Sequence, residues 1–502
     1  MDNVEYLLDY DKGDHMKYKL YRFLLFLMFG VILTVETAAA DSWISLTEIP
    51  IKGWRIYNGS SSDASPEYSP GINRMKSTGG RESGNYNVIN GKMYENSIGA
   101  HVRDTGEKGR AIIEYDISSY DYDTFAATVG KAYASSGLSA KAQFFVYVDG
   151  KVAAESPILG PTEDYYMEVD ITDAKSLAIA AGDGGDSILN DEVAWGNPVL
   201  FKKNEAIIEA IEFAGASYII PMNGEIDLST AEGHITYDNG VVKEVPVSDI
   251  EISGLDTSAE GKISVLLTYD STTYEQEFYV VAPERYAYLS DMEISSYIIL
   301  DAKTPKINTT EDGVTPANTG GISYSHGIWT HPTGNEADNG YGELVWNIAN
   351  KGYTRLRVIV GKPNDTYCMK GMYFVYLDGK LLESSPLLYA GQTHTFDLDI
   401  SGGSTLTLAV TGGEETSDFY FWDSTEWCDP VVWIEADVKA PIVVNIPDGM
   451  LWAVAIGFIG LMFVSSAVYT IVMKKNKITP GTSEFHFPEN PAGKASKLVE
   501  TR

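Results

Sequence analysis

The sequence predicts an all-β protein with two β-sandwiches of jelly-roll type, a smaller sandwich between them and one transmembrane helix near the C-terminus. Three observations predict this class. A long segment occurs twice within the 502 residues, and its apolar runs are short and end at turn residues. No long helical period occurs between residues 41 and 446, whereas residues 450–473 are uniformly apolar.

Residues 16–40 have the order of a secretory signal peptide. A basic start, an apolar run and small residues before Asp41 follow one another: Lys17, Lys19 and Arg22, then 23–35, then Ala38 to Ala40. The apolar run rises only about 20 Å as a helix, which is too short for a bilayer core. A buried helix or an N-terminal anchor is the alternative.

Residues 450–473 contain no charged side chain and are followed by Lys474, Lys475 and Lys477. At 1.5 Å per residue this segment reaches about 36 Å, enough to cross a membrane. The lysines favour the cytoplasmic side. We therefore expect a linker at 437–449, a single transmembrane helix at 450–473 and a short cytoplasmic tail at 474–502, with the N-terminal part extracellular at the cell membrane.

The chain is strongly acidic, with 70 acidic and 37 basic residues and a net charge of −33. Such a charge repels polyanions, so we expect no nucleic-acid partner. The two cysteines are too few for a disulfide-dense domain or a four-cysteine zinc site. Burial of apolar side chains must therefore supply the stability of the folded part.

Residues 43–203 recur in diverged form at 285–436. Residues 145–151, Phe-Val-Tyr-Val-Asp-Gly-Lys, match 374–380, Phe-Val-Tyr-Leu-Asp-Gly-Lys, and a Ser-Pro pair follows each at the same distance. Both runs are apolar on both faces and end in an Asp-Gly turn, as in a central strand of a sandwich. Residues 204–284, between the copies, alternate short apolar runs with turns, which suits a small immunoglobulin-like sandwich.

The repeat resembles the NPCBM family of carbohydrate-binding modules. The resemblance rests on these elements in order, each seen twice: Ile98 to His101 and Ile328 to His331, Val129-Gly130 and Val360-Gly361, the Phe-Val-Tyr strand, the Ser-Pro step, and Asp191 to Trp195 and Asp423 to Trp427. It implies a galactose-binding-like jelly roll, with binding loops at one end and often a structural calcium. The middle segment resembles bacterial immunoglobulin-like spacer domains.

Sugar recognition needs an aromatic face and fixed hydrogen-bonding groups. His101 and His331 are candidates for those groups, or they orient a loop. Trp195 and Trp427 are candidates for stacking, or they pack in the core. The second copy has the denser aromatic set, which adds Trp329, Tyr420, Phe421 and Trp422.

Candidate calcium ligands are aspartates in both copies: Asp183, Asp186, Asp191, Asp423 and Asp429. A solvated loop is the alternative, because their spacing is not that of an EF-hand. Cys368 and Cys428 both belong to the second copy and are both replaced in the first, by Ser139 and Gly196. This favours a disulfide over two free thiols.

No nucleophile elbow, metalloprotease helix or phosphate loop occurs, so we expect no enzyme. The sequence predicts a bacterial cell-surface protein that binds glycan or envelope polysaccharide non-covalently through one or both modules. The alternative is a structural or adhesive surface protein whose sandwiches bind protein or envelope components without sugar recognition.

Overall fold

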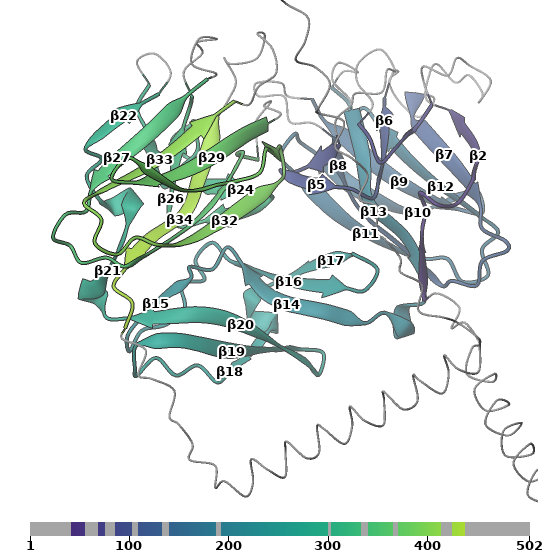
Figure 1. The fold of residues 1–502 in the computed structure, drawn as a ribbon. Helices are drawn as coiled ribbons and strands as arrows, with labels where there is room; N and C mark the ends of the chain where they lie inside the picture. The colour runs from purple at the N-terminus through teal and green to yellow at the C-terminus, as the bar shows by residue number, and fades with distance from the viewer. Residues whose placement is uncertain are drawn as a thin grey trace, which may run out of the picture. The chain divides into compact units, whose positions relative to one another are not determined.

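The computed structural model describes residues 42–55, 69–75, 86–102, 109–132, 140–186, 192–299, 303–332, 340–364, 370–412 and 424–436 (Figure 1). All of the described residues lie within one compact unit of the chain, which ends at Ala436. The predicted signal peptide, linker, transmembrane segment and tail lie outside the described residues. Within those residues, no helix has the length and apolar character needed to cross a membrane.

The first sandwich has two antiparallel sheets. The first sheet has the order β11-β8-β13-β6-β3, with β1 added beside β13. Its strands are β1 (Trp43–Ser45), β3 (Gly71–Ile72), β6 (Ser97–His101), β8 (Thr124–Lys131), β11 (Asp164–Asp170) and β13 (Glu192–Phe201). The second sheet has the order β10-β9-β12-β7-β2. Its strands are β2 (Ile51–Arg55), β7 (Ala111–Asp116), β9 (Ala142–Val148), β10 (Lys151–Leu159) and β12 (Ser176–Gly182). A hairpin, β4 (Asn87–Ile89) and β5 (Lys92–Tyr94), stands apart from both sheets.

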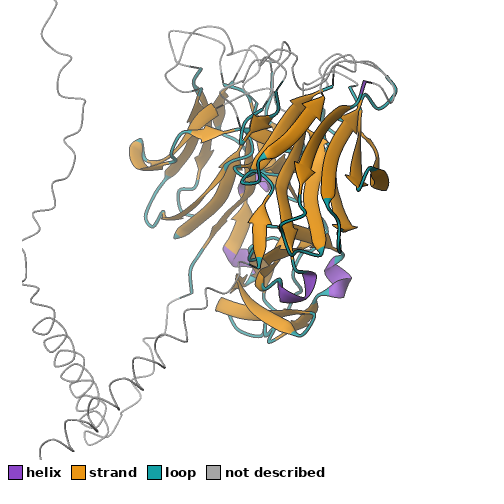
Figure 2. Cartoon of the chain, turned by 90° about the vertical axis from the view of Figure 1, so that its right-hand side faces the viewer, coloured by secondary structure: helices purple, strands orange, loops and turns teal. Residues whose placement is uncertain are grey.

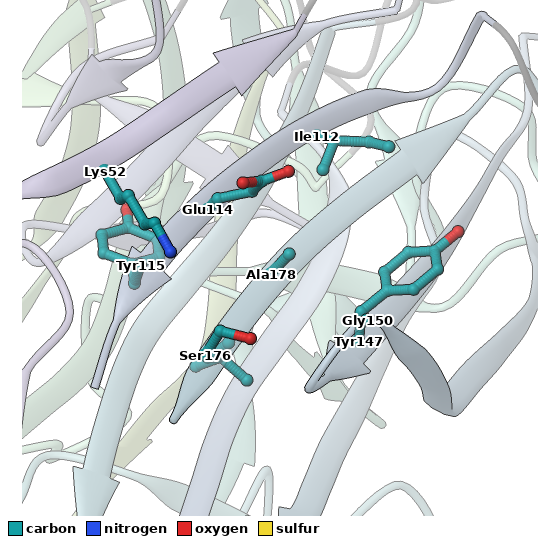
Figure 3. A pocket seen from close by; sticks show the side chains of 9 residues that line it. Lys52, Ile112, Glu114, Tyr115, Tyr147, Gly150, Ser176 and Ala178 are labelled. Atoms are coloured by element: carbon teal, nitrogen blue, oxygen red, sulfur yellow. The ribbon is translucent and has the colours of Figure 1, made fainter. Parts of the chain in front are cut away.

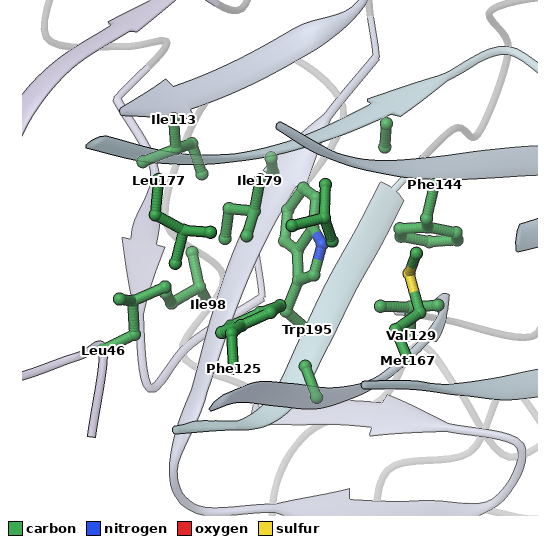
Figure 4. Packing of buried hydrophobic residues seen from close by; sticks show 14 of the residues in the cluster. Leu46, Ile98, Ile113, Phe125, Val129, Phe144, Met167, Leu177, Ile179 and Trp195 are labelled. Carbon is green, nitrogen blue, oxygen red and sulfur yellow. The ribbon is translucent and has the colours of Figure 1, made fainter. Parts of the chain in front are cut away.

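The core of the first sandwich lies between these sheets (Figure 4). Alternate residues of each strand point inward, among them Ile113, Phe125, Phe144 and Ile179, all fully buried or nearly so. Trp195 lies among them and meets Phe144 edge to face, with ring centroids 5.6 Å apart. Because buried aromatic side chains remove the most apolar area from water, this pair is a main contributor to the stability of the sandwich.

The middle segment also forms two sheets around its own core. The first has the order β14-β16-β17, with β14 (Ile208–Ala214), β16 (Glu232–Tyr237) and β17 (Val242–Val245). The second has the order β15-β20-β19-β18, with β15 (Ile219–Pro221), β18 (Glu251–Ser253), β19 (Gly261–Tyr269) and β20 (Thr272–Val281). We call this part the spacer. Its immunoglobulin-like identity stays a prediction.

The second sandwich repeats the strand order of the first. One sheet has the order β23-β26-β34-β28-β32, with β21 beside β34. Its strands are β21 (Tyr286–Tyr288), β23 (Lys306–Ile307), β26 (Gly327–Thr330), β28 (Arg355–Gly361), β32 (Thr393–Asp399) and β34 (Thr425–Trp433). The other has the order β22-β27-β33-β29-β30, with β31 beside β29. Its strands are β22 (Ser296–Ile298), β27 (Gly342–Asn347), β29 (Lys370–Leu377), β30 (Lys380–Ser384), β31 (Leu388–Tyr389) and β33 (Thr405–Thr411). The hairpin β24 (Ala317–Thr319) and β25 (Ile322–Tyr324) corresponds to β4 and β5.

Strands and turns dominate the described residues, and the helices there are single turns (Figure 2). These turns are η3 (Lys203–Glu205), η4 (Val247–Asp249), η5 (Pro283–Arg285) and η6 (Leu289–Asp291). The prediction of an all-β chain with sandwich domains is therefore confirmed.

The sequence motifs of the repeat have structural roles. Asp149-Gly150 and Asp378-Gly379 have positive φ at both positions, as a two-residue hairpin turn requires. Ser156 and Ser385, of the two Ser-Pro steps, accept hydrogen bonds through Oγ from the backbone N–H groups of Phe144 and Tyr373, at 2.9 and 3.0 Å. Each serine thus satisfies a buried backbone donor of the central strand.

Candidate functional site

A buried polar cluster occupies one end of the first sandwich. His101 ends β6, Lys131 ends β8 and Glu192 begins β13, and the register of the sheet places these three ends together. All three residues are at most 5% exposed. The His101 Nδ1 lies 2.7 Å from the carbonyl oxygen of Val102, and its Nε2 lies 3.6 Å from Glu192 Oε1. The connections next to these strand ends include residues 103–108, 133–139 and 187–191, which lie outside the described residues.

The second sandwich has a corresponding cluster. His331 Nδ1 lies 2.8 Å from the carbonyl oxygen of Pro332, as His101 does from Val102. Lys362 and Glu426 are almost fully buried at the same end. Thr330 and Thr425 join here through their hydroxyl groups at 2.6 Å. Both predicted histidines are therefore buried and held by the carbonyl of the next residue, which supports the loop-orienting interpretation.

Of the tryptophans predicted as stacking candidates, Trp195 and Trp427 lie in the cores, whereas Trp329 is buried on the other face of its strand, beside His331 and Lys303. Trp195, Trp329 and Trp427 are at most 1% exposed. The Trp427 ring meets Tyr373 edge to face, with centroids 5.2 Å apart, and its Nε1 donates to Thr330 Oγ1 at 3.2 Å. For Trp195 and Trp427 this supports core packing. The role of Trp329 as a ligand-facing residue stays a prediction, because its ring meets His331, at 6.1 Å between centroids, and the Lys303 ammonium on the outer face of β26.

The other predicted aromatic ligands, Tyr420 and Trp422, lie outside the described residues, as do Asp191, Asp423 and Cys368. Those predictions stay predictions, and so does the pairing of the two cysteines. Cys428 itself lies on β34, buried against Ala317 and Tyr324. This burial raises the pKa of its thiol.

Three of the predicted calcium ligands lie among the described residues, Asp183 and Asp186 in the first sandwich and Asp429 in the second. Asp183 is buried and Asp186 is exposed. Asp429 is buried and already engaged, because its Oδ2 accepts a hydrogen bond from the Tyr218 N–H at 3.1 Å and lies 3.5 Å from Arg357 Nη1. Asp429 stays a predicted calcium ligand, and these contacts give it a second role. It joins the second sandwich to the spacer.

The equivalent residue in the first sandwich, Asn197, also contacts the spacer, but it donates a hydrogen bond where Asp429 accepts one. Asn197 and Asp429 follow the two buried tryptophans by two residues and both have positive φ, 44° and 46°. Asn197 donates from Nδ2 to the carbonyl oxygen of Gly240 in the spacer at 2.6 Å. The sequence difference at this position is thus explained by two different contacts with the spacer.

A pocket opens on the outer face of the first sandwich, over the sheet β10-β9-β12-β7-β2 (Figure 3). Its volume is about 280 Å³. Small side chains of Ser176 and Ala178 on β12 form its floor, with Tyr147 on β9 on one side and Glu114 on β7 on the other. Lys52, from the edge strand β2, closes the far side. We call this pocket the outer groove.

The outer groove combines an aromatic ring with charged and hydroxyl groups. The hydroxyl of Tyr147 accepts a hydrogen bond of 2.6 Å from Arg110 Nη1, which fixes the ring. The Arg110 guanidinium is held in turn over the Phe145 ring, at 3.5 Å from the centroid. Lys52 donates, Glu114 accepts and Ser176 does both. An ordered ring beside such groups suits non-covalent binding of a small polyhydroxylated ligand.

The second sandwich keeps only part of this groove. At the positions of Tyr147, Ala178 and Glu114 it has Tyr376, Thr407 and Val345. The aromatic ring is retained, the floor is bulkier and the carboxylate is absent from that position. The two outer faces therefore differ in chemistry.

The sequence reasoning missed the outer groove. Its signal was present in the alternation of the Phe-Val-Tyr strand and in the Ala residues of residues 177–180. However, the groove exists only because β9, β12 and β7 are neighbours in the sheet, and no single segment of the sequence predicts this strand order.

The similarity to a known domain family falls on the two sandwiches. The model of the NPCBM/NEW2 domain matches residues 60–201 and 285–432. A search of the curated proteins gives no match. One similar solved structure is the M60 catalytic domain with the CBM51-1 and CBM51-2 domains of Clostridium perfringens ZmpB. It shows 20% identity over 78% of this chain and 39% of that chain, with a TM-score of 0.28.

Two further solved structures contain CBM51 modules alone. The tandem modules of Sp3GH98 from Streptococcus pneumoniae SP3-BS71 show 15% identity over 78% of this chain and 99% of that chain, with a TM-score of 0.28. The CBM51 of Clostridium perfringens GH95, in complex with methyl-galactose, shows 24% identity over 32% and 99%, with a TM-score of 0.23. The NPCBM/NEW2 matches fall on the two sandwiches and together cover more than half of the 502 residues. The chain belongs to the NPCBM/NEW2 domain family.

Proposed function

We propose that this protein binds glycans non-covalently at a cell surface and does no catalysis. The observation that carries the proposal is the outer groove on a sandwich of this family. Its tyrosine is fixed by Arg110 on one side, and Ser176, Glu114 and Lys52 line the rest of the groove. An aromatic face with donors and acceptors around it is what the apolar side and the hydroxyls of a pyranose require.

The charge of the chain narrows the ligand class. A net charge of −33 repels polyanionic polysaccharides. Neutral glycans are therefore the expected ligands. Methyl-galactose and N-acetylglucosamine, the ligands in two CBM51 structures from Clostridium perfringens, are the first probes.

Membrane display is part of the proposal. The segment 16–40 directs export, and residues 450–473 anchor the chain with its N-terminal part outside and residues 474–502 inside. Protease treatment of intact cells tests this arrangement, because it should remove the sandwiches and leave an epitope tag after Arg502 protected. A protected N-terminal part would contradict it.

A glycan array probed with the full chain in mild detergent tests the binding function. For the best ligand, Tyr147→Ala should weaken binding at least about tenfold, or ~1.4 kcal/mol, because the ring face is lost. Tyr165→Ala is the matched control, since Tyr165 is 39% exposed on β11, which belongs to the other sheet.

The outcomes separate the alternatives. Binding that is unchanged in Tyr147→Ala would move the site away from the outer groove, to the strand ends that carry His101 and His331. Failure of every glycan and of purified envelope polysaccharide would contradict glycan binding and favour a structural or adhesive role.

A further inference from the structure

A histidine surrounded by carboxylates lies on the outer face of the spacer sheet β14-β16-β17. His234 is on the central strand β16, and the register places Glu212 of β14 and Glu244 of β17 directly opposite it. Glu232 lies two residues earlier on β16 and so points to the same face. The ligand atoms of Glu232, His234 and Glu244 all lie within 4.8 Å of one another. In the part of the chain that the structure describes, this is the one place where such ligand atoms converge.

The imidazole of His234 is buried and lacks a hydrogen bond at Nε2. The residue is 5% exposed, and its Nε2 has no hydrogen-bonding partner among the described residues. That nitrogen points toward Glu232 Oε2, which is 3.8 Å away, while Nδ1 is 4.0 Å from Glu212 Oε1. Both separations exceed a hydrogen bond. A buried ring nitrogen facing a carboxylate across such a gap is what a site for an ion between them would present.

Negative charge around this histidine is only partly offset. Burial, together with the charges of Asp164 and Glu232, raises the pKa of Glu244. Lys92, from β5 of the first sandwich, is a cation near Glu244, Asp164 and Glu212, but burial lowers its pKa. The four carboxyl groups of Asp164, Glu212, Glu232 and Glu244 thus share one nearby ammonium group, that of Lys92. A bound divalent cation would relieve this imbalance.

We propose that Glu232, His234 and Glu244 form a binding site for a zinc-type divalent cation in the spacer. One imidazole nitrogen and two carboxylate oxygens are ligands that Zn²⁺ accepts, whereas Ca²⁺ takes six to eight oxygens. Ligands about 2.0–2.2 Å from a tetrahedral ion lie roughly 3.4 Å apart, so the present side chains need only small rotations. The ion would join β16 to β17.

The site was not expected from the sequence. Glu232-Gly233-His234 has the two-residue spacing that puts both side chains on one face of a strand. Glu244 completes the group only through the register of the β16–β17 hairpin, in which His234 pairs with Glu244.

Zinc titration of the full chain in detergent, after removal of metal with a chelator, tests the proposal. We expect one tight zinc equivalent by isothermal titration calorimetry, a rise in the unfolding temperature with ZnCl₂ and no such rise with CaCl₂. The double variant Glu232→Gln/Glu244→Gln should bind zinc at least about 100-fold more weakly, since changing a residue that only hydrogen-bonds to a metal ligand already costs about 10–100-fold. Glu251→Gln, an exposed residue of β18, is the control for general acidity.

His234→Asn removes the nitrogen ligand and should have the same effect. If that variant fails to fold, the double glutamine variant still decides, because both of its residues are exposed. The absence of a tight zinc equivalent in the unaltered chain, or its survival in the double variant, would overturn the proposal.

Discussion

Phe144 and Trp195 meet across the two sheets of the first sandwich, edge to face and with ring planes at 87°. Tyr373 and Trp427 repeat the contact in the second sandwich at 84°. The closing tryptophan of each repeat therefore belongs to a core pair. This explains why the same residue type ends both copies although the residues after it differ.

Replacing either tryptophan should lower stability. Trp195→Ala or Trp427→Ala leaves a large cavity, and we expect a loss of about 3–5 kcal/mol in the free energy of unfolding of that sandwich. Urea denaturation followed by circular dichroism measures it. Tyr165→Ala, on the surface, should change it by less than about 0.5 kcal/mol. A Trp195→Ala variant as stable as the unaltered chain would contradict the core assignment.

Ser385, the serine of the second Ser-Pro step, should contribute to the stability of the second sandwich. Ser385→Ala leaves the buried Tyr373 N–H without its acceptor, which should cost about 1–3 kcal/mol. Ser384→Ala is a neighbouring control, because Ser384 is exposed at the end of β30. Equal denaturation midpoints for the two variants would show that the hydrogen bond contributes nothing.

Asp312 should make the second sandwich sensitive to acid. Burial opposes ionisation of Asp312, but hydrogen bonds from the Thr315 hydroxyl, from the N–H groups of Val314 and Thr315 and from the Thr310 hydroxyl outweigh it and lower the pKa to about 2. A group with a depressed folded-state pKa stabilises the protein above its unfolded-state value of 3.8, and this stability is lost as the pH falls toward 2.

Thermal unfolding between pH 5 and pH 2 tests this sign. Asp312→Asn should flatten the acid-side decline of the unfolding temperature of the second sandwich, whereas Asp173→Asn, an exposed change in the first sandwich, should not. An identical decline in Asp312→Asn and the unaltered chain would refute the assignment.

Asp429 should couple the unfolding of the spacer to that of the second sandwich. Asp429→Ala removes the acceptor of the Tyr218 N–H and the partner of Arg357, for a loss of about 2–3 kcal/mol. Differential scanning calorimetry should then separate two transitions. Asp429→Asn keeps an acceptor oxygen, so its loss of stability should lie between zero and that of Asp429→Ala. One unchanged transition in Asp429→Ala would place the coupling elsewhere, for example in the apolar contact of Tyr279 with Trp433.

Much of the fold was predictable because it is encoded locally and twice. Alternation along residues 145–151 and 374–380 gave the central strands, and Asp-Gly gave their turns. The repeat then supported each assignment with a second copy. The NPCBM resemblance, drawn from the order of weak motifs, is confirmed by the family match.

The sites were less predictable, for a physical reason. Trp329 is of a residue type that often binds sugars, and only the structure shows that its side chain is buried. Asp429 is of a residue type that often binds metals, and only the structure shows its contacts with Arg357 and Tyr218, which join the second sandwich to the spacer. Tyr147 and His234 gain their neighbours from strand order and register, which link residues far apart in the sequence.

Asn197 is a donor and Asp429 an acceptor at equivalent positions, and this difference fixes the order of the two sandwiches along the chain. One sandwich offers a donor to the spacer and the other an acceptor, from the same place in the same fold. Exchanging the two copies along the chain would set an aspartate carboxylate against the Gly240 carbonyl oxygen and an asparagine against Arg357. Divergence after duplication has thus made the halves non-interchangeable.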